Sequence, residues 1–276
     1  MLRWFLQNVL LCALVLCLVL SATQLVGQTT PPLPERNPER VATPAPQKPL
    51  PPGEVETIPW NPAEIATEKA KCSEALSSIK LDYESLAPIK QGLCGAPAPI
   101  LLKSLGSNPK VAIDPPAIVT CALAKALKTW LDKTVQPKAE RLLGSPVAKL
   151  HSAGSYACRN RYGNPYQLLS EHALANALDI REFVLASGES IAVLDDWPKR
   201  LFTPPLPLPN PARVAALGAF VPMISAIPAD QRSKFVKQVH DDACDTFGTV
   251  LGPDANEAHK NHFHFDMKQR RASLCQ

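Results

Sequence analysis

The chain has 276 residues and a mass of 29.9 kDa, of which 46% are hydrophobic and 20% charged. These fractions match those of ordinary folded proteins, so they exclude a wholly disordered chain and a polytopic membrane protein. The net charge is only +4, and no basic run is interleaved with aromatic residues, which argues against a nucleic-acid partner.

The N-terminus carries an uncharged apolar segment. Residues 4–26 contain no charged side chain and follow Arg3. A basic residue before an apolar run is typical of a secretory signal peptide, but the run also approaches the roughly 20 residues that span a bilayer. We therefore expect residues 1–27 to be either a cleaved signal peptide or an N-terminal membrane anchor.

A proline-rich segment follows the leader. The chain holds 29 prolines, and between residues 28 and 63 proline recurs about every third position with almost no apolar periodicity. Such a segment cannot bury enough surface to fold, and its composition favours an extended polyproline II spacer. The sequence predicts a linker at 28–63, either a stalk that holds a domain away from a membrane or a disordered remnant of the leader.

The remaining residues, 64–276, are enough for one domain with its own core. Six of the eight cysteines fall there, without a CxxC pair and behind an export signal, which favours up to three disulfides in an oxidising compartment. Pairing sequence neighbours joins Cys72 to Cys94, Cys121 to Cys158, and Cys244 to Cys275.

Apolar periodicity predicts the elements of this domain. Residues 63–80, 117–135 and 229–247 have helical spacing, residues 179–194 have the pattern of a β-hairpin, and residues 261–267 alternate as a strand. The expected fold class is therefore α+β, with a small antiparallel sheet flanked by helices.

The histidines carry the strongest chemical signal. Three of the six lie between residues 259 and 264. On a strand, His262, His264 and Asp266 would share one face, while Phe263 and Phe265 would pack inward on the other.

A second polar pair lies at His172 and Asp179. If the chain turns near Asn176 and enters a strand, Asp179 returns toward His172. Together with one imidazole of the HxH motif they would suit a tetrahedral zinc whose fourth position is water; alternatively, the two are a satisfied core pair. We expect no site role for His151, at the start of a loop, or for His240, on a solvated helix face.

Several motifs resemble the bacterial extensin-like C-terminal domain family over roughly residues 70–276. They are SYxCR at 155–159, SEHA at 170–173, NALDI at 176–180, FGTVLGP at 247–253 and HxxHFHxD at 259–266. This family is similar to the zinc D-alanyl-D-alanine carboxypeptidases and murein endopeptidases, which share a His-x6-Asp motif and a C-terminal HxH. We therefore expect a fold like that of those zinc peptidases.

The resemblance implies a role for each matching residue. The zinc ligands would be His172, Asp179 and His264, with His262 as the general base or a histidine behind the ligands. The three further site residues would be His259 as a third site histidine, Arg159 facing the developing oxyanion, and Ser170 contacting substrate.

Two positions depart from the pattern of these relatives. Ala175 stands where a glycine is usual, a change that we expect to be tolerated if φ is negative there. Asn261 stands where some relatives have a catalytic glutamate, so His262 would have to act as the base.

The implied function is a zinc-dependent peptidase that acts on peptide bonds of peptidoglycan in the periplasm of a Gram-negative bacterium. The spacing of the C-terminal histidines favours an endopeptidase over a D,D-carboxypeptidase. The alternative is a cell-wall binding or structural module that keeps the peptidase fold without the chemistry.

Overall fold

The computed structural model describes residues 51–53, 56–198 and 227–276. The predicted leader and most of the predicted linker lie outside the described residues. Within the described ranges, no helix combines the length and the hydropathy needed to cross a membrane.

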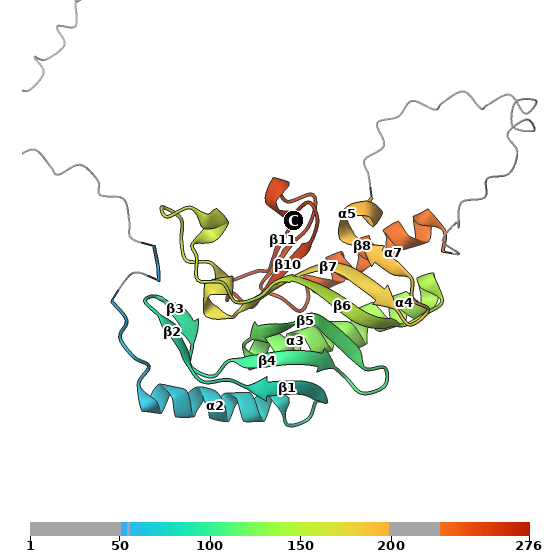
Figure 1. Cartoon of the computed structure of the whole chain (residues 1–276). Helices are drawn as coiled ribbons and strands as arrows, with labels where there is room; N and C mark the ends of the chain where they lie inside the picture. The colour runs from blue at the N-terminus through green and yellow to red at the C-terminus, as the bar shows by residue number, and fades with distance from the viewer. Residues whose placement is uncertain (1–50, 54–55, 199–226) are drawn as a thin grey trace, which may run out of the picture. The chain divides into compact units, whose positions relative to one another are not determined.

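The described chain has a mixed α/β fold, drawn in Figure 1. Its helices are α2 (Pro62–Leu76), α3 (Cys121–Trp130), the π-helical η1 (Leu131–Val135), α4 (Gln136–Leu143), α5 (Val193–Asp196), α7 (Ala229–Ala243) and the 3-10 helices η2 (Arg161–Gly163), η3 (Glu171–Leu174) and η4 (Glu257–His259). Its strands are β1 (Leu81–Ser85), β2 (Ile89–Gln91), β3 (Cys94–Ala96), β4 (Ile100–Leu105), β5 (Val111–Val119), β6 (Val147–Gly154), β7 (Ala177–Leu185), β8 (Ser190–Ala192), β9 (Thr249–Leu251), β10 (Phe263–Asp266) and β11 (Leu274–Cys275).

Most strands belong to one mixed sheet. Its described strands number nine, in the order β1-β4-β5-β6-β7-β10-β9-β11, with β8 paired to β7. The pairs β5–β6 and β9–β11 are parallel and the others antiparallel. The expected small antiparallel sheet is therefore not what the fold contains. The parallel pair β5–β6 is joined by α3, η1 and α4, the kind of crossover that parallel neighbours require.

Sequence periodicity missed the strands between β1 and β5 because their alternation is broken. The pairing of β4 with β5 shifts register between Leu102 and Ser104, and two exposed prolines, Pro115 and Pro116, lie inside β5. Proline cannot donate to a ladder, so it argues against a strand. The predicted helix at 117–135 accordingly begins only at Cys121, where the Thr120 side chain accepts a hydrogen bond from the Leu123 N–H at 3.3 Å.

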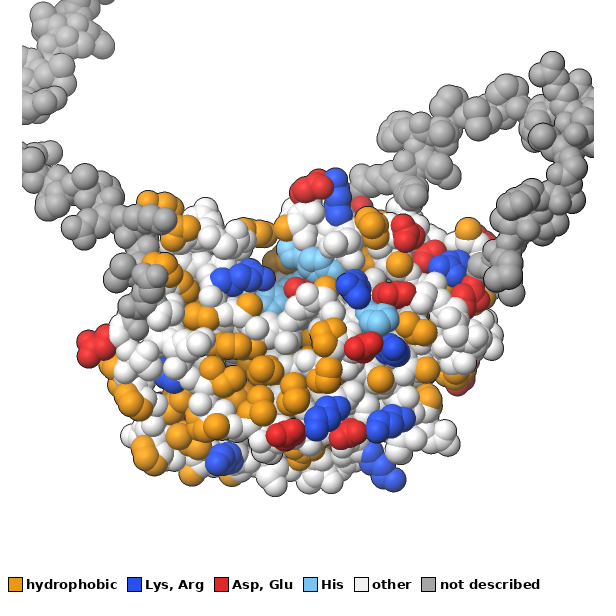
Figure 2. Space-filling model, in the orientation of Figure 1, with side chains coloured by type: hydrophobic (Ala, Val, Ile, Leu, Met, Phe, Trp, Pro, Cys, Tyr) orange, Lys and Arg blue, Asp and Glu red, His pale blue; other side chains and the backbone are white. Residues whose placement is uncertain are grey.

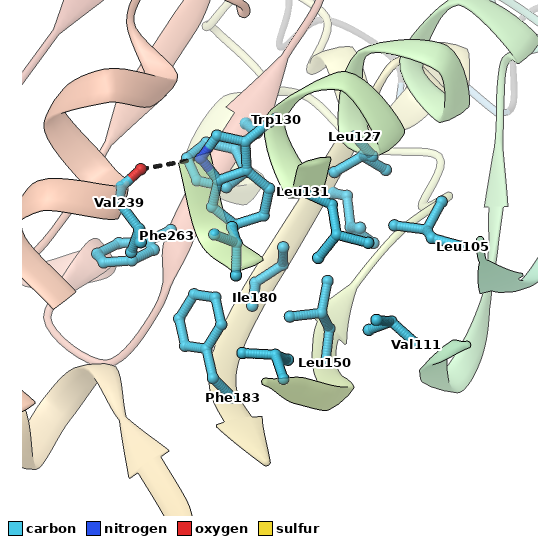
Figure 3. Close-up of a cluster of buried hydrophobic side chains, with 14 of the residues drawn as sticks. Leu105, Val111, Leu127, Trp130, Leu131, Leu150, Ile180, Phe183, Val239 and Phe263 are labelled. Atoms are coloured by element: carbon cyan, nitrogen blue, oxygen red, sulfur yellow. Dashed lines mark hydrogen bonds between the residues drawn. The ribbon is translucent and has the colours of Figure 1, made fainter. Parts of the chain in front are cut away.

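One face of the sheet packs against helices to form the hydrophobic core. Trp130 of α3 lies at its centre, and Figure 3 shows its indole donating to the Val239 carbonyl of α7, a bond of 2.9 Å. The Trp130 ring lies 6.1 Å from that of Phe183 and 5.0 Å from that of Phe265. Phe263 and Phe265 are fully buried, as the alternation in β10 predicted.

The helix α2 begins with a capping box and ends earlier than predicted. The Asn61 side chain accepts from the Ala63 N–H, Glu64 accepts from the Asn61 N–H, and Pro62 occupies the first turn. The helix ends at Leu76 rather than at residue 80.

Three disulfides link the described chain, as the cysteine count predicted. One of the three predicted pairings, Cys244–Cys275, is confirmed. The other two were wrong, because Cys72 pairs with Cys121 and Cys94 with Cys158, across 49 and 64 residues. Pairing cysteines that are neighbours in the sequence gave the wrong partners, because α2 packs on α3 and the hairpin β2–β3 lies beside the segment after β6.

The last part of the predicted linker contacts this domain. The Leu93 N–H donates to the Pro52 carbonyl at 3.0 Å, and the Gly92 N–H donates to Thr57 Oγ1 at 2.8 Å. The Trp60 indole donates to the Ile89 carbonyl at 2.8 Å. These residues therefore pack on the hairpin β2–β3.

Two histidines differ from expectation. His240 is 4% exposed rather than solvated, because its ring packs between Trp197 and Phe263 and Nε2 contacts the Gln276 carbonyl at 3.2 Å. His151 lies within strand β6 rather than at the start of a loop, with Nδ1 3.3 Å from the Asp114 carbonyl.

The predicted hairpin at 179–194 is present as β7 and β8, although residues 193–196 form α5.

Candidate metal centre

Three donor atoms from distant parts of the sequence form a small triangle. His172 Nε2 lies 3.2 Å from Asp179 Oδ1 and 3.1 Å from His264 Nδ1. His264 Nδ1 lies 2.9 Å from Asp179 Oδ1. All three side chains are buried, so the predicted ligand set lies together in one place.

Two adjacent strands place two corners of this triangle. His264 of β10 lies directly opposite Asp179 of β7 in antiparallel register. Both side chains point away from the aromatic core, because Phe263 and Phe265 fill the other face. On the other side of β7, Gly154 of β6 faces Asp179, and a Cβ there would lie 3.0 Å from Asp179 Oδ2. Glycine therefore leaves room for the carboxylate.

A short helical turn places the third corner. The Ser170 side chain caps η3 by accepting from the His172 N–H at 3.3 Å, and Ala175 ends the turn. The Asn176 N–H donates back to the Glu171 carbonyl at 3.0 Å before the chain enters β7. The expected turn near Asn176 is therefore present, and it brings Asp179 back to His172.

The condition under which alanine would be tolerated at position 175, a negative φ, is not met. Its φ of 52° and ψ of 24° are left-handed, the conformation that glycine adopts without steric cost. Ala175 is fully buried at the C-terminal end of η3, and its carbonyl accepts from the Thr120 N–H at 2.8 Å. The surrounding contacts therefore hold a strained residue in place.

In each candidate ligand histidine, the ring nitrogen that points away from the triangle also has a hydrogen-bond partner. His172 Nδ1 lies 2.5 Å from the Ser155 carbonyl, an acceptor, which leaves Nε2 with its lone pair toward the triangle. His264 Nε2 lies 3.2 Å from Asp266 Oδ2, and Asp266 Oδ1 accepts from the Lys268 N–H at 2.9 Å. Carbonyl and carboxylate partners of this kind fix tautomer and ring orientation in metal sites.

The triangle is electrostatically coupled. Burial by itself would raise the pKa of Asp179, but the neighbouring imidazoles of His172 and His264 outweigh it and hold that pKa well below its usual range. Burial would lower the pKa of His264, but its hydrogen bonds to Asp179 and Asp266 raise it to about 9. A proton on His264 Nδ1 therefore bridges the donors, at the place where a cation would be stabilised.

The donor set fits a zinc ion. Two imidazoles and one carboxylate are ligands that zinc takes in sites that keep an open position. Tetrahedral bonds of about 2.0–2.1 Å separate neighbouring ligand atoms by about 3.3 Å. The three donor atoms are 2.9–3.2 Å apart, so they would need to spread by only a few tenths of an ångström.

The remaining predicted site residues line one open cleft of about 350 Å³ around the triangle. Figure 2 shows histidine side chains gathered in this hollow, with basic side chains at one rim. The predicted residues among its lining are Arg159, Ser170, His172, Asp179, His259, His262 and His264.

The other two histidines of the C-terminal motif lie next to the triangle. His262 Nε2 is 3.8 Å from Asp179 Oδ2, and its Nδ1 is 2.8 Å from Asn261 Oδ1. The His259 ring lies 5.3 Å from the His262 ring and 5.8 Å from the His264 ring. Burial is the main reason that the pKa of His262 is lowered and that of His259 falls to about 4. Both are therefore neutral at pH 7.

Sequence reasoning missed several residues of this site. Gly154 leaves room for the Asp179 carboxylate, and Ser155 contributes only its backbone carbonyl. Of the two, only the glycine could have been noticed in the sequence, because glycine in a strand often marks a close approach of another group. Arg161, Tyr162 and Arg270 line the cleft but belong to loops without periodicity. Ser170 was expected to contact substrate, yet its hydroxyl caps η3.

The fold and the site together define a disulfide-linked α/β domain with a two-histidine, one-carboxylate cluster in an open cleft. The family described as extensin-like protein C-terminus matches residues 70–204 and 216–276. The chain therefore belongs to the extensin-like C-terminal family. No curated protein and no solved structure was found to match it.

Proposed function

We propose that this protein is a periplasmic zinc-dependent peptidase that cleaves peptide bonds of peptidoglycan. The observation that carries the proposal is the triangle of His172 Nε2, Asp179 Oδ1 and His264 Nδ1, with each imidazole held from behind. A satisfied core pair would need neither the third donor nor an open cleft beside it. The resemblance to zinc carboxypeptidases and murein endopeptidases supplies the substrate class.

The three residues of the triangle would hold the zinc. When bound, zinc acts as a Lewis acid and lowers the pKa of a coordinated water to about 7. The Ser155 carbonyl and Asp266 keep the donor nitrogens of His172 and His264 turned toward the position that the ion would take.

His262 is the proposed general base, and Asn261 supports this role. The Asn261 side-chain oxygen accepts from His262 Nδ1–H, which leaves the lone pair on Nε2, the atom nearest Asp179. Burial and nearby positive groups lower the pKa of His262, so the ring is neutral and able to accept a proton at pH 7. Asn261 therefore orients the proposed base at the position where some relatives have a glutamate.

The rest of the cleft suits a peptide substrate. Arg159 lines it and would stabilise the negative oxygen that develops on the scissile carbonyl, a contact worth roughly 2.7–4 kcal/mol in other enzymes. His259 packs beside His262, with Nδ1 2.9 Å from Asn256 Oδ1, and its proposed role is to hold substrate or the base in position. The resemblance favours an endopeptidase over a D,D-carboxypeptidase.

Metal content and turnover test the proposal in two variants of the oxidatively folded full chain. We expect about one zinc per wild-type chain, none in His264→Ala, and release of peptide fragments from purified sacculi by the wild type alone. His262→Ala should keep its zinc and lose the rate. A folded wild type that takes up no zinc at neutral pH would defeat the proposal, and binding to sacculi without fragment release would instead favour the cell-wall binding module.

The proposed location rests on the leader and the disulfides. The export signal expected at residues 1–27 and the three disulfides support an oxidising compartment, and the family resemblance favours the periplasm. If the leader is retained, residues 4–26 would anchor the protein in the inner membrane.

A further inference from the structure

A compact loop stands beside the candidate metal centre. In Figure 1 this olive-yellow loop and an orange-red segment before β10 project from the same side of the sheet. Residues 160–169 close on themselves through a β-bridge between Asn160 and Leu169 and a hydrogen bond from the Arg161 N–H to the Leu168 carbonyl at 3.0 Å. The Asn160 side chain also donates to the Pro165 carbonyl at 3.1 Å. The loop is therefore internally braced.

This braced loop exposes large side chains. Tyr162, Tyr166 and Leu168 are 63%, 66% and 68% exposed, so none of them serves the core. Aromatic groups on a rigid loop at a cleft are typical of a ligand contact, because they offer a large apolar face at little entropic cost.

Tyr162 is held in an unfavourable backbone conformation. Its φ of 56° and ψ of 19° are left-handed, where glycine or asparagine would be favoured over a bulky residue. The ring lines the cleft, 6.4 Å from the ring of His259. Because neither burial nor backbone preference accounts for a tyrosine here, its ring is best explained by a molecule that occupies the cleft.

The cleft also carries positive charge that the described carboxylates do not neutralise. Arg159, Arg161 and Arg270 line it, and none of them forms an ion pair within the described ranges. Arg270 Nε donates to Thr249 Oγ1 at 3.1 Å.

The carboxylates of the cleft already have partners. Glu171 pairs with Lys268 at 2.8 Å, and the two aspartates of the centre contact its histidines. Guanidinium groups recognise carboxylates through paired, charge-assisted hydrogen bonds. The three arginines, which pair with no described carboxylate, therefore suit an anionic ligand.

We propose that the loop at residues 160–169 is the substrate-recognition element, and that it binds a peptide bearing free carboxylates. Arg161 and Arg270 bind the carboxylates, and the Tyr162 ring packs against the peptide chain next to His259. This inference rests on the proposed function for the identity of the substrate, because peptidoglycan peptides carry free carboxylates. It adds positioning and specificity residues that the zinc chemistry does not need.

Binding can be measured separately from hydrolysis by using the metal-free full chain, which also removes zinc as a competing carboxylate ligand. The probe is a mixture of muropeptides released from sacculi by a muramidase, used intact and with its carboxylates amidated. We expect amidation, or Arg161→Gln in the protein, to weaken the Kd by about tenfold or more. The two changes together should cost little more than amidation alone, because amidation already removes the contact that Arg161 makes.

The tyrosine separates a binding role from a structural one. Asparagine tolerates the left-handed conformation, so Tyr162→Asn should keep or raise the Tm while weakening muropeptide binding severalfold, and Tyr162→Phe should retain binding. Tyr83→Asn on β1 and Arg141→Gln on α4 are matched controls that should leave the Kd unchanged.

Three results would overturn the inference. They are equal binding of intact and amidated muropeptides, equal binding of peptide-free glycan strands, or a Tyr162→Asn variant with a lower Tm and an unchanged Kd. Failure of the proposed function has a different signature. The loop variants would still lose muropeptide binding, while the wild type would take up no zinc and release no fragments.

Discussion

At the scale of single residues, the candidate ligands and the proposed base depend on neighbouring groups that fix the orientation of their rings. The two candidate ligand histidines each present one nitrogen to the triangle because the other nitrogen contacts a carbonyl or a carboxylate. The Asn261 side-chain oxygen contacts Nδ1 of His262 in the same way. Changes at these supporting residues should therefore alter metal affinity or pH dependence while the ligands and the base remain.

Asp266→Asn tests the support of His264. The amide keeps an oxygen for the Lys268 N–H but removes the negative partner of His264 Nε2. We expect zinc affinity to fall by about 10- to 100-fold, measured by competition with a chromophoric chelator. Asp254→Asn, at an exposed position, is the control. An unchanged affinity would show that Asp266 does not orient the ligand.

Asn261→Asp tests the base. A carboxylate beside His262 Nδ1 favours the protonated ring, so it should raise the pKa of His262 from its lowered value. The acidic limb of the kcat profile should then move to higher pH at unchanged zinc content. An unmoved limb would mean that another group serves as the base.

At the scale of elements, one disulfide lies next to the groups that hold the candidate ligands, and another lies further from them. Cys94–Cys158 ties the hairpin β2–β3 to the segment that contains Ser155 and Arg159. Cys72–Cys121 ties α2 to the start of α3, which reaches the turn at Ala175 through the Thr120 N–H but contacts none of the three candidate ligands. The loops that they close are similar in length, at 64 and 49 residues.

Replacing each cysteine pair by serine should separate these two effects. Chain-entropy arguments give both disulfides a similar stabilisation of roughly 4 kcal/mol, so urea unfolding should show comparable losses. The Cys94→Ser/Cys158→Ser variant should lose more zinc affinity than the Cys72→Ser/Cys121→Ser variant, because the Ser155 carbonyl is no longer fixed behind His172. Equal zinc affinity in the two variants would contradict this division.

At the scale of the whole molecule, buried histidines make folding depend on pH. The pKa of His259 is about 4 in the folded chain, mainly through burial, against an ordinary value of 6.5. The pKa of His262 is lowered as well. Between these pH values the unfolded chain binds more protons, so stability falls as the pH decreases.

The metal-free protein should therefore lose stability from about pH 6.5 down to pH 4. The raised pKa of His264 opposes this slope mainly above about pH 6.5, where the unfolded chain has lost that proton, and the low pKa of Asp179 leaves its carboxylate charged across the window. The free energy of unfolding in urea, measured at pH 7 and pH 5, should fall, and His259→Gln should reduce the difference. Stability that stays level across this range would contradict the burial of a neutral His259.

The sequence alone was enough to predict β10 and the hairpin of β7 and β8. Residues from His262 to Asp266 alternate between polar and aromatic, so the two kinds of side chain lie on opposite faces of the strand. Such alternation is strongly specified where the aromatic face must be buried. The cysteine count likewise predicted up to three disulfides within one domain, whereas the predicted leader and most of the predicted linker lie outside the described residues. Local pattern is sufficient where each residue responds mainly to its nearest neighbours along the chain.

Only the tertiary structure decided which distant segments meet. The strands β4 and β5, two of the three disulfide pairings and the burial of His240 all depend on partners far away in sequence. The left-handed Ala175 and Tyr162 are likewise held by contacts that no local propensity favours. The sequence named the three donors, but the antiparallel register of β7 with β10 and the turn at Ala175 bring their atoms within 3.2 Å. The physical reason is that a register and a turn are fixed by long-range packing and pairing, which periodicity along the chain does not encode.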